Sequence, residues 1–351
     1  MSKKERGNFL EDFVVGQVFH HKVGKTITGG LFNAFTEFGM TTNPVSKNAR
    51  YAERYGYSGM TAPPGLVMNV VFSQSVEDIS ENARANLEYT DIRFGALVYI
   101  GDTIEVDTTI LGVSPSSSSS DRGIVHVQTT GRNQDGDVVL TLQRKVQIWK
   151  RCDAAPVEAA NLSSIPHVPC QLAIPEYDQS KRYAELSYLT NDDTYFEDLN
   201  PGDCIEHSRG RTITTAHMEW TATLDNTSQV HSNQHIIDED PARYIGGQLI
   251  VYGGIPFNLC LGLSCPDVAD NSLGDVCYPT GRHTGPVFVG DTLFASTEVT
   301  RTAVYPDRPD LGLVATILRG HKHIQKGAAK EKVEVFYLER VMAVKRRSHY
   351  A

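Results

Sequence analysis

The sequence predicts an α+β protein built from two tandem domains of one fold. Three observations favour this class. The chain has 351 residues, enough for about two domains. Its halves repeat each other, and each half runs from helix-compatible segments into stretches that alternate apolar and polar residues. The composition, 40 % hydrophobic and 21 % charged, is typical of a globular chain and excludes a disordered or collagen-like one.

The internal repeat is the strongest of these observations. Gly24-Lys-Thr-Ile-Thr28 recurs as Gly210-Arg-Thr-Ile-Thr214, and Leu10-Glu-Asp-Phe13 recurs as Phe196-Glu-Asp-Leu199, both 186 positions later. Further on, Gly101-Asp-Thr103 recurs as Gly290-Asp-Thr292, 189 positions later (290 − 101). The second half therefore contains a net insertion of about three residues between the matched blocks.

The same elements are expected in the same order in both halves. Helices are predicted over 31–39 and 65–80 in the first half and over 216–224 and 254–263 in the second. The second helix of each pair is apolar on nearly all sides, which predicts burial in a sheet curled around it. Strands are predicted over 103–110, 123–128 and 138–149, with exposed links at 114–120 and 133–137.

These elements divide the chain into three parts. Residues 1–150 are predicted to form the first domain and 185–351 the second. Residues 151–184 contain four prolines, at positions 156, 166, 169 and 175, and are predicted to be an extended linker.

Charge and patterning exclude several classes of partner. The 33 basic and 42 acidic residues leave a net charge of −9, which disfavours nucleic acid and anionic lipid. No apolar run approaches the ~18 residues of a membrane span, and no apolar signal-peptide core follows Met1 to Arg6, so a cytoplasmic protein is expected. The six cysteines show no CxxC pair and are interpreted as structural. His231 and His235 lack a third ligand, so no metal site is expected.

The motifs resemble one known family. Pro286-Val-Phe-Val-Gly-Asp-Thr292 is similar to the start of a strand in MaoC-like hotdog dehydratases. That family also carries Asp-x-Asn-Pro-apolar-His on the loop before a glycine-led central helix, and the likeness covers both halves. The resemblance implies a double hotdog, in which each antiparallel sheet wraps a central helix. It also implies reversible addition of water to an α,β-unsaturated acyl-CoA, with coenzyme A as part of the substrate and no other cofactor. The oligomeric state is left open, a homo-oligomer included.

The two halves depart from the family motif in different ways. The first half reads Thr41-Thr-Asn-Pro-Val-Ser46 and has lost the acid/base pair. The second reads Asp225-Asn-Thr-Ser-Gln-Val-His231, which keeps an acid and a histidine but spaces them six apart instead of five. Asn226 therefore stands in the strict register. Asp225 is expected to be the carboxylate beside His231, because a loop can absorb one residue.

Further residues are expected around this pair. Gly254 opens the second central helix, where free N–H groups favour developing negative charge, and is the candidate oxyanion donor. Asn226, Tyr252 and Gly253 are expected to bind substrate. Cationic side chains must hold the phosphates of coenzyme A. The candidates for that role are Arg93 and Arg282, with Lys47, Arg50 and Lys145 as further donors.

Several functions remain open at this level. The main expectation is a hydro-lyase acting on a short, branched dicarboxylic acyl-CoA. One alternative is an (R)-specific hydratase for straight-chain enoyl-CoA, which needs the same pair of residues. Another is a coenzyme A thioester-binding hotdog protein without catalysis, which the altered motifs favour. A thioesterase would place its amide on the central helix, but Asn258 there is matched by Asn69 in the first half, so both are interpreted as a helix feature.

Overall fold

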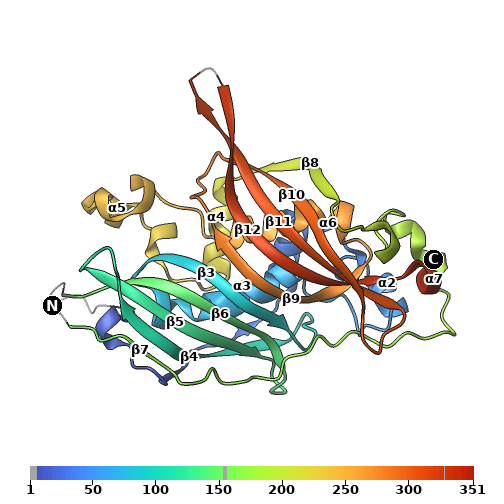
Figure 1. Ribbon diagram of the computed structural model, residues 1–351, viewed down its shortest axis with the longest axis horizontal. Coiled ribbons are helices and arrows are strands. Elements are labelled where there is room, and N and C mark those ends of the chain that lie inside the picture. Colours follow the sequence, from blue (N-terminus) through green and yellow to red (C-terminus); the bar gives the residue numbers. More distant parts are fainter. Residues whose placement is uncertain (1–5, 153–155, 328) are drawn as a thin grey trace.

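Twelve antiparallel strands form one long, twisted sheet in the computed structural model, which describes residues 6–152, 156–327 and 329–351 (Figure 1). The main path of neighbours is β1-β4-β5-β6-β3-β9-β12-β11-β10-β8, with β2 and β7 also pairing to β4. The strands are β1 Val18–His20, β2 Lys25–Thr26, β3 Ala83–Phe94, β4 Thr103–Pro115, β5 Arg122–Arg132, β6 Val138–Trp149, β7 Ala160–Asn161, β8 Cys204–Thr212, β9 Ser272–His283, β10 Thr292–Val304, β11 Leu311–Lys326 and β12 Ala329–Lys345.

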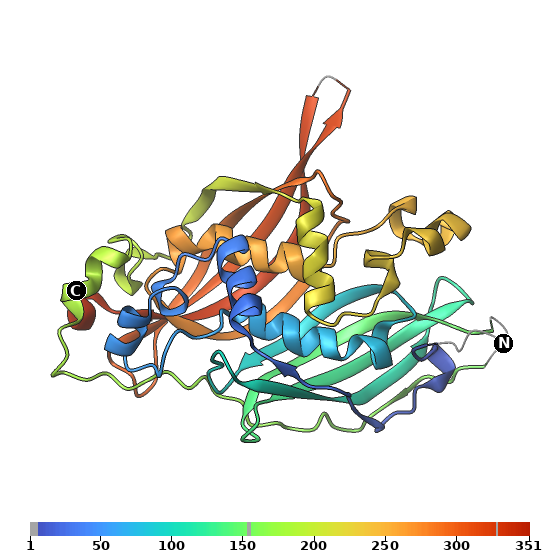
Figure 2. The ribbon, with the colours of Figure 1, turned by 180° about the vertical axis from the view of Figure 1, so that it is seen from behind.

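The two halves meet where β3 pairs with β9. On each side of this seam the sheet curls around one buried helix, α3 (Pro64–Gln74) in the first half and α6 (Gly254–Val268) in the second (Figure 2). Both helices are buried nearly all round, as their all-apolar sequences predict. This is the predicted architecture: an antiparallel sheet wrapped around a central helix, formed twice and joined edge to edge.

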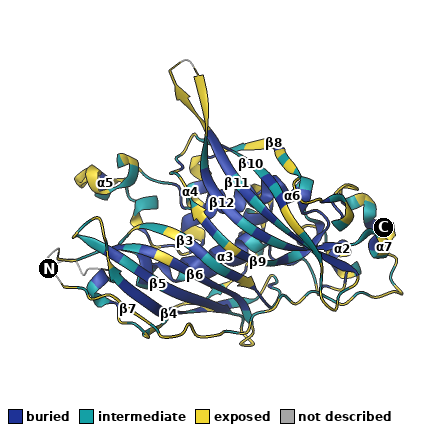
Figure 3. Cartoon of the chain, in the orientation of Figure 1, coloured by how far each residue is buried: buried dark blue, intermediate teal, exposed yellow. Residues whose placement is uncertain are grey.

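The smaller helices flank these two. They are α1 Gly29–Asn33, α2 Ala49–Arg54, α4 Thr215–Thr223, α5 Gln234–Glu239 and α7 Arg347–Tyr350. Two π-helical turns occur in the first half, Ala34–Phe38 directly after α1 and Val76–Ser80 after α3. The predicted helix 31–39 is thus α1 plus a π turn, and α6 runs five residues beyond its predicted end. The tip of the β11–β12 hairpin and much of α5 are exposed (Figure 3).

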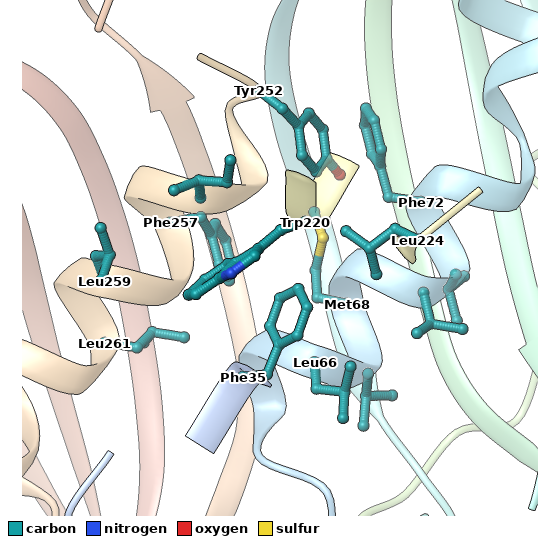
Figure 4. Close-up of a cluster of buried hydrophobic side chains, with 14 of the residues drawn as sticks. Phe35, Leu66, Met68, Phe72, Trp220, Leu224, Tyr252, Phe257, Leu259 and Leu261 are labelled. Atoms are coloured by element: carbon teal, nitrogen blue, oxygen red, sulfur yellow. The ribbon is translucent and has the colours of Figure 1, made fainter. Parts of the chain in front are cut away.

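The core is formed where α3 and α6 pack together. Aromatic and aliphatic side chains from α1, the π turn after it, α3, α4 and α6 fill the space that the curled sheet encloses, with the rings of Phe35 and Trp220 5.1 Å apart (Figure 4). The buried Asn69 Nδ2 donates to the carbonyl of Gly254 at 3.1 Å, and Asn258 Nδ2 donates to that of Phe35 at 3.2 Å. These asparagines hold helices together in both halves, which supports their interpretation as a helix feature.

The connector and two strands were incompletely predicted. The predicted linker is largely extended, and its short β7 pairs with β4. The exposed links between β4 and β5 and between β5 and β6 lie where the sequence placed them. However, β3 and β9, which form the seam, were not among the predicted strands. The buried Cys260 and Cys265 are part of the core.

Candidate active site

A pocket of about 290 Å³ lies between the two halves. One wall comes from the first half: the end of α3, the π turn after it and the start of β3. The opposite wall comes from the second half: the loop before α6, the start of α6 and the segment that follows β9. Neither half alone encloses the space. The lining side chains include Phe72, Ser80, Arg84, Asn86, Tyr89, Trp149, Asn226, His231, Arg243, Tyr252 and His283, together with the backbone of Gly253.

The loop that carries the predicted pair has the same backbone bonds as its counterpart in the first half. The N–H of Asn226 donates to the carbonyl of Thr221 at 3.1 Å, and the N–H of Thr41 donates to that of Thr36 at 3.1 Å. Both pairs are 185 positions apart (226 − 41 and 221 − 36), as are His231 and Ser46. Asn226 therefore occupies the position of Thr41, five residues before His231, as in the family motif.

Asp225 lies one residue earlier and outside the pocket. Its backbone is left-handed, with φ of 58°, as is that of Met40 in the first half, with φ of 61°. Its carboxylate accepts a hydrogen bond from Lys25 Nζ at 2.7 Å and is 53 % exposed. The expectation that Asp225 partners His231 does not fit this geometry. Asn226, whose residue is only 9 % exposed, lines the pocket in its place.

The offset between matching residues of the two halves changes by one, and this change arises in a helix and not in the loop. Before the loop the halves match at 186 positions, since Ile27 and Ile213 make the same backbone bonds. The π turn Ala34–Phe38 fits one residue more into the first half than the regular α4 does, which lowers the difference to 185. Between His231 and Ile250 the second half is then four residues longer, so the net difference becomes the three inferred from the repeat.

His231 is held as a neutral base. Its Nδ1 must donate to the carbonyl of Ile250, 2.8 Å away, because a carbonyl only accepts. The proton is therefore on Nδ1, and Nε2 carries a lone pair on the pocket side, with no hydrogen-bond partner in the described part of the chain. Burial lowers the pKa of His231 to about 4, although the bond to Ile250 acts in the opposite direction. At neutral pH its imidazole is uncharged.

The start of α6 faces His231 through Tyr252 and Gly253. The Tyr252 ring lies 5.5 Å from the imidazole, and both Tyr252 and Gly253 line the pocket, while their binding of substrate stays a prediction. Gly254 is not among the lining residues. A Cβ there would lie 1.6 Å from Asn69 Oδ1, so its glycine is required by the close approach of α3. Gly253, at the N-cap, lines the pocket. In the described part of the chain the N–H groups of Gly253 and Gly254 have no backbone partner, whereas the N–H of Ile255 donates to the carbonyl of Tyr252.

The cationic residues named from the sequence lie elsewhere. Arg93 pairs with Asp91 at 2.8 Å, and Arg282 covers the ring of Tyr337 at 4.1 Å; neither lines the pocket. The arginines that do line it are Arg84 and Arg243, both exposed.

Four lining residues were missed because they lie on the unpredicted strands or at their ends: Arg84, Asn86, Tyr89 and His283. Tyr89 Oη is 3.1 Å from His283 Nε2, and burial lowers the pKa of His283 to about 4. Only the correct assignment of β3 and β9 as the seam would have located them.

Within residues 6–152, 156–327 and 329–351 no three His, Cys, Asp or Glu side chains gather as metal ligands would, and His235 instead pairs with Glu239 at 3.2 Å. Nor does any helix there have the length and apolar character that crossing a membrane requires.

A double hotdog with a histidine-bearing loop against the start of its second central helix defines the class of MaoC-like hydro-lyases. The profile of the mesaconyl-CoA hydratase family matches residues 1–321, and the chain belongs to that family. A β-methylmalyl-CoA dehydratase from Chloroflexus aurantiacus is 35 % identical over 89 % of this chain and 87 % of its own length. A mesaconyl-CoA hydratase from Cereibacter sphaeroides is 31 % identical over 92 % of this chain and 91 % of its own.

Solved structures support the same assignment. A MaoC domain dehydratase from Chloroflexus aurantiacus superposes with a TM-score of 0.83 at 30 % identity, covering 99 % of this chain and 100 % of that one. A Mycobacterium tuberculosis protein with a double hotdog fold gives 0.78 at 21 % identity over 96 % of this chain and 98 % of its own, which supports the fold alone. The predicted fold and the predicted hydro-lyase class are therefore confirmed.

Proposed function

We propose that this protein reversibly adds water to mesaconyl-CoA, forming β-methylmalyl-CoA, the compounds for which its relatives are named. The observation that carries the proposal is the neutral His231, whose free Nε2 lines a pocket beside Asn226 and the start of α6. A base, a polar group to orient water and N–H donors at a helix start are what hydration of an enoyl thioester needs.

The reaction assigns one role to each group. The Asn226 amide and His231 hold a water, and His231 Nε2 takes its proton as the water oxygen bonds to the β-carbon of the double bond. Negative charge moves to the thioester oxygen, which the N–H groups at the start of α6 stabilise. The imidazolium then delivers a proton to the α-carbon. One hydroxyl and one hydrogen are added, and His231 returns to its neutral form.

His231 acts alone in this loop as an acid and base. An amide such as that of Asn226 donates and accepts hydrogen bonds but does not exchange a proton at neutral pH. Both proton transfers therefore pass through one imidazole, which favours delivery of the hydrogen and the hydroxyl to the same face of the double bond. No cofactor beyond the coenzyme A of the substrate takes part in this scheme.

Coenzyme A is proposed to lie over the exposed end of the pocket. Arg84 and Arg243 lie there, and the Arg243 guanidinium covers the Trp149 ring at 4.9 Å. A guanidinium stacked on an indole stays fixed and keeps its N–H groups for phosphate oxygens. These two arginines replace Arg93 and Arg282 as the proposed phosphate ligands.

The test follows the ultraviolet absorbance of the enoyl thioester when the pure protein is given mesaconyl-CoA and, separately, crotonyl-CoA. Fast loss of absorbance with mesaconyl-CoA and little with crotonyl-CoA is the expected result. The reverse preference would support the straight-chain hydratase instead. No loss with either compound would leave a coenzyme A thioester-binding protein and overturn the proposal.

A further inference from the structure

A charged side chain without an acidic partner lies directly behind the pocket wall. Arg144, on β6, is fully buried. Its Nη2 donates to Ser75 Oγ at 2.8 Å and its Nη1 to Ser80 Oγ at 3.4 Å, and its guanidinium lies 4.2 Å from the Phe72 ring centre. Ser80 and Phe72 both line the pocket, so the guanidinium is one layer behind its surface.

No counter-charge neutralises this group. Among the described residues no carboxylate lies within ion-pair distance of Arg144, and its Nε has no hydrogen-bond partner. Burial lowers the pKa of Arg144 only to about 10, so it stays charged at neutral pH. A buried charge without an opposite charge is costly, and bringing an anion near it recovers part of that cost.

Asn86, on the pocket surface, also has polar atoms whose hydrogen bonds are not satisfied. It lines the pocket from β3, and among the described residues both atoms of its buried amide, Nδ2 and Oδ1, lack a partner at normal hydrogen-bond distance. The amide also interacts with the Tyr89 hydroxyl, an effect that acts to lower the pKa of Tyr89 against the rise caused by burial. Buried amides in folded proteins are nearly always satisfied by the protein, by water or by a ligand. A donor and an acceptor are thus presented to whatever occupies the pocket.

The second half shows what completes this arrangement. Arg340 matches Arg144 in the sheet, because β12 and β6 correspond at 196 positions, and Asp275 matches Asn86 at 189. In the second half Arg340 donates to Asp275 from Nε at 3.0 and 3.1 Å and from Nη2 at 2.8 Å, and the pair is buried. The carboxylate of Asp275 therefore satisfies the guanidinium there. In the first half that carboxylate is replaced by an amide.

We propose that the pocket is built to receive a carboxylate carried on the acyl group of the substrate, which takes the place that Asp275 fills in the other half. Asn86 contacts this carboxylate, and Arg144 behind it supplies the positive charge. The inference rests on the proposed function, whose mesaconyl group bears such a second carboxylate. It assigns the choice between dicarboxylic and monocarboxylic acyl groups to these two residues.

The experiment installs the missing acid in the protein. In Asn86→Asp the new carboxylate should pair with Arg144 and exclude that of the substrate. The kcat/KM for mesaconyl-CoA should fall by about 30-fold or more, the usual effect of losing a buried charge pair. The value for crotonyl-CoA, which has no free carboxylate, should stay the same or rise. Because an ion pair is gained, the thermal midpoint of this variant should not fall below that of the wild type.

Two further variants complete the design. Arg144→Met should produce the same change in substrate preference, and Asp275→Asn, the matched change in the other half, should leave the preference unaltered. If Arg144→Met does not fold, Asn86→Asp decides. A wild type that prefers mesaconyl-CoA and an Asn86→Asp variant that keeps this preference would overturn the inference and leave the proposed function standing. A wild type that hydrates neither thioester would end both.

Discussion

The two halves place the same loop against the same kind of helix, yet the loop of the second half faces a pocket and the loop of the first half is covered. In the second half His231 and Asn226 face open space. In the first half Thr42 Oγ1 donates to Asp270 at 2.5 Å, and Asn43 Nδ2 donates to the carbonyls of Ala269 and Ser272 at 2.9 and 2.8 Å. In the second-half loop, by contrast, Asn226 Oδ1 accepts from the N–H of Ser228 and His231 Nδ1 donates to Ile250, while among the described residues Asn226 Nδ2 and His231 Nε2 have no partner. The site is therefore the loop whose side chains keep a polar atom for a ligand.

Aromatic residues close the covered side from outside. Lys345, fully buried at the end of β12, donates to the hydroxyls of Tyr51 and Tyr55 at 2.5 and 3.1 Å. Tyr183 from the connector and Tyr350 from α7 pack on the same cluster. Burial lowers the pKa of Lys345 to about 7. Segments added outside the repeat thus cover the half that lost its acid/base pair.

The largest difference in activity between the two halves is expected when the last side chain of each loop is removed. His231→Ala should lower kcat by about 10²–10⁴ because it removes the only proton carrier of the loop. Ser46→Ala, at the matched position, should leave turnover nearly unchanged. Hydration rates of both purified variants, with circular dichroism to verify folding, provide the measurement. Comparable losses in the two would mean that the covered loop also takes part in catalysis.

Asn226 and Asp225 are neighbours in one loop, and their substitution should have very different effects on kcat. Asn226→Ala removes the amide that we propose orients water and should lower kcat by about 10-fold or more, as loss of an oriented polar contact does. Asp225→Asn changes only an exposed pair with Lys25 and should be nearly silent. Steady-state kinetics on both variants decide between them. An inactive Asp225→Asn protein would show that the loop rearranges to bring Asp225 into the pocket.

The third comparison concerns the glycines of the two central helices. A Cβ at Gly254 would lie 1.6 Å from Asn69 Oδ1, and a Cβ at Gly65 would lie 2.0 Å from Asn258 Oδ1. Gly254→Ala and Gly65→Ala should therefore each lower the free energy of unfolding by about 1–3 kcal/mol. Denaturant unfolding measures this. If Gly254→Ala keeps wild-type stability but loses turnover, the residue acts in catalysis and not in packing.

The smallest expected effect is on acid stability. His283 has Phe94 at its matched position (283 − 94 = 189), so only the open half titrates there. Burial lowers the pKa of His283 from 6.5 to about 4. Its contribution is complete above pH 6.5 and is lost as the pH falls toward 4, because the unfolded chain then binds a proton that the folded chain does not.

His283→Phe should accordingly reduce the drop in thermal midpoint between pH 7 and pH 4.5. Its value at pH 7 need not match the wild type, since the bond to Tyr89 is also lost. The pH difference within each protein is the quantity compared. An unchanged difference would show that the pKa of His283 is the same in the folded and unfolded chains.

The sequence predicted the duplicated architecture because the same pattern of apolar residues, which must be buried, occurs in both halves. It missed β3 and β9 because their ladders are irregular. The β3 to β6 register shifts three times within one strand, and the alternation of apolar and polar residues is lost with it. Asn86 and Tyr89 lie on this strand, so the first-half wall of the pocket was missed with it.

The sequence located only part of the site, and the physical reason differs from the one that applies to the strands. His231, Tyr252 and Gly253 were located because the motif and the helix start are local patterns. The choice between Asp225 and Asn226 depended on aligning the two halves to within one residue. The extra residue of the first half lies in the π turn after α1 and not in the loop. A π turn has nearly the same composition as an α turn, so no pattern distinguished the two. Asp225 was therefore favoured on chemistry while the backbone favoured Asn226.

The π turn at Ala34–Phe38 also records how the two copies diverged. The gain or loss of one residue in a loop displaces the side chains that follow it by about one residue's length. In a loop that carries site residues, it would move those side chains away from their positions. Here the odd residue is wound into a wider helical turn, and the loops that follow keep matching backbone bonds and matching left-handed residues. The helix thus accommodates the one-residue difference before the loop begins, so both loops keep the same five-residue spacing, from Thr41 to Ser46 and from Asn226 to His231.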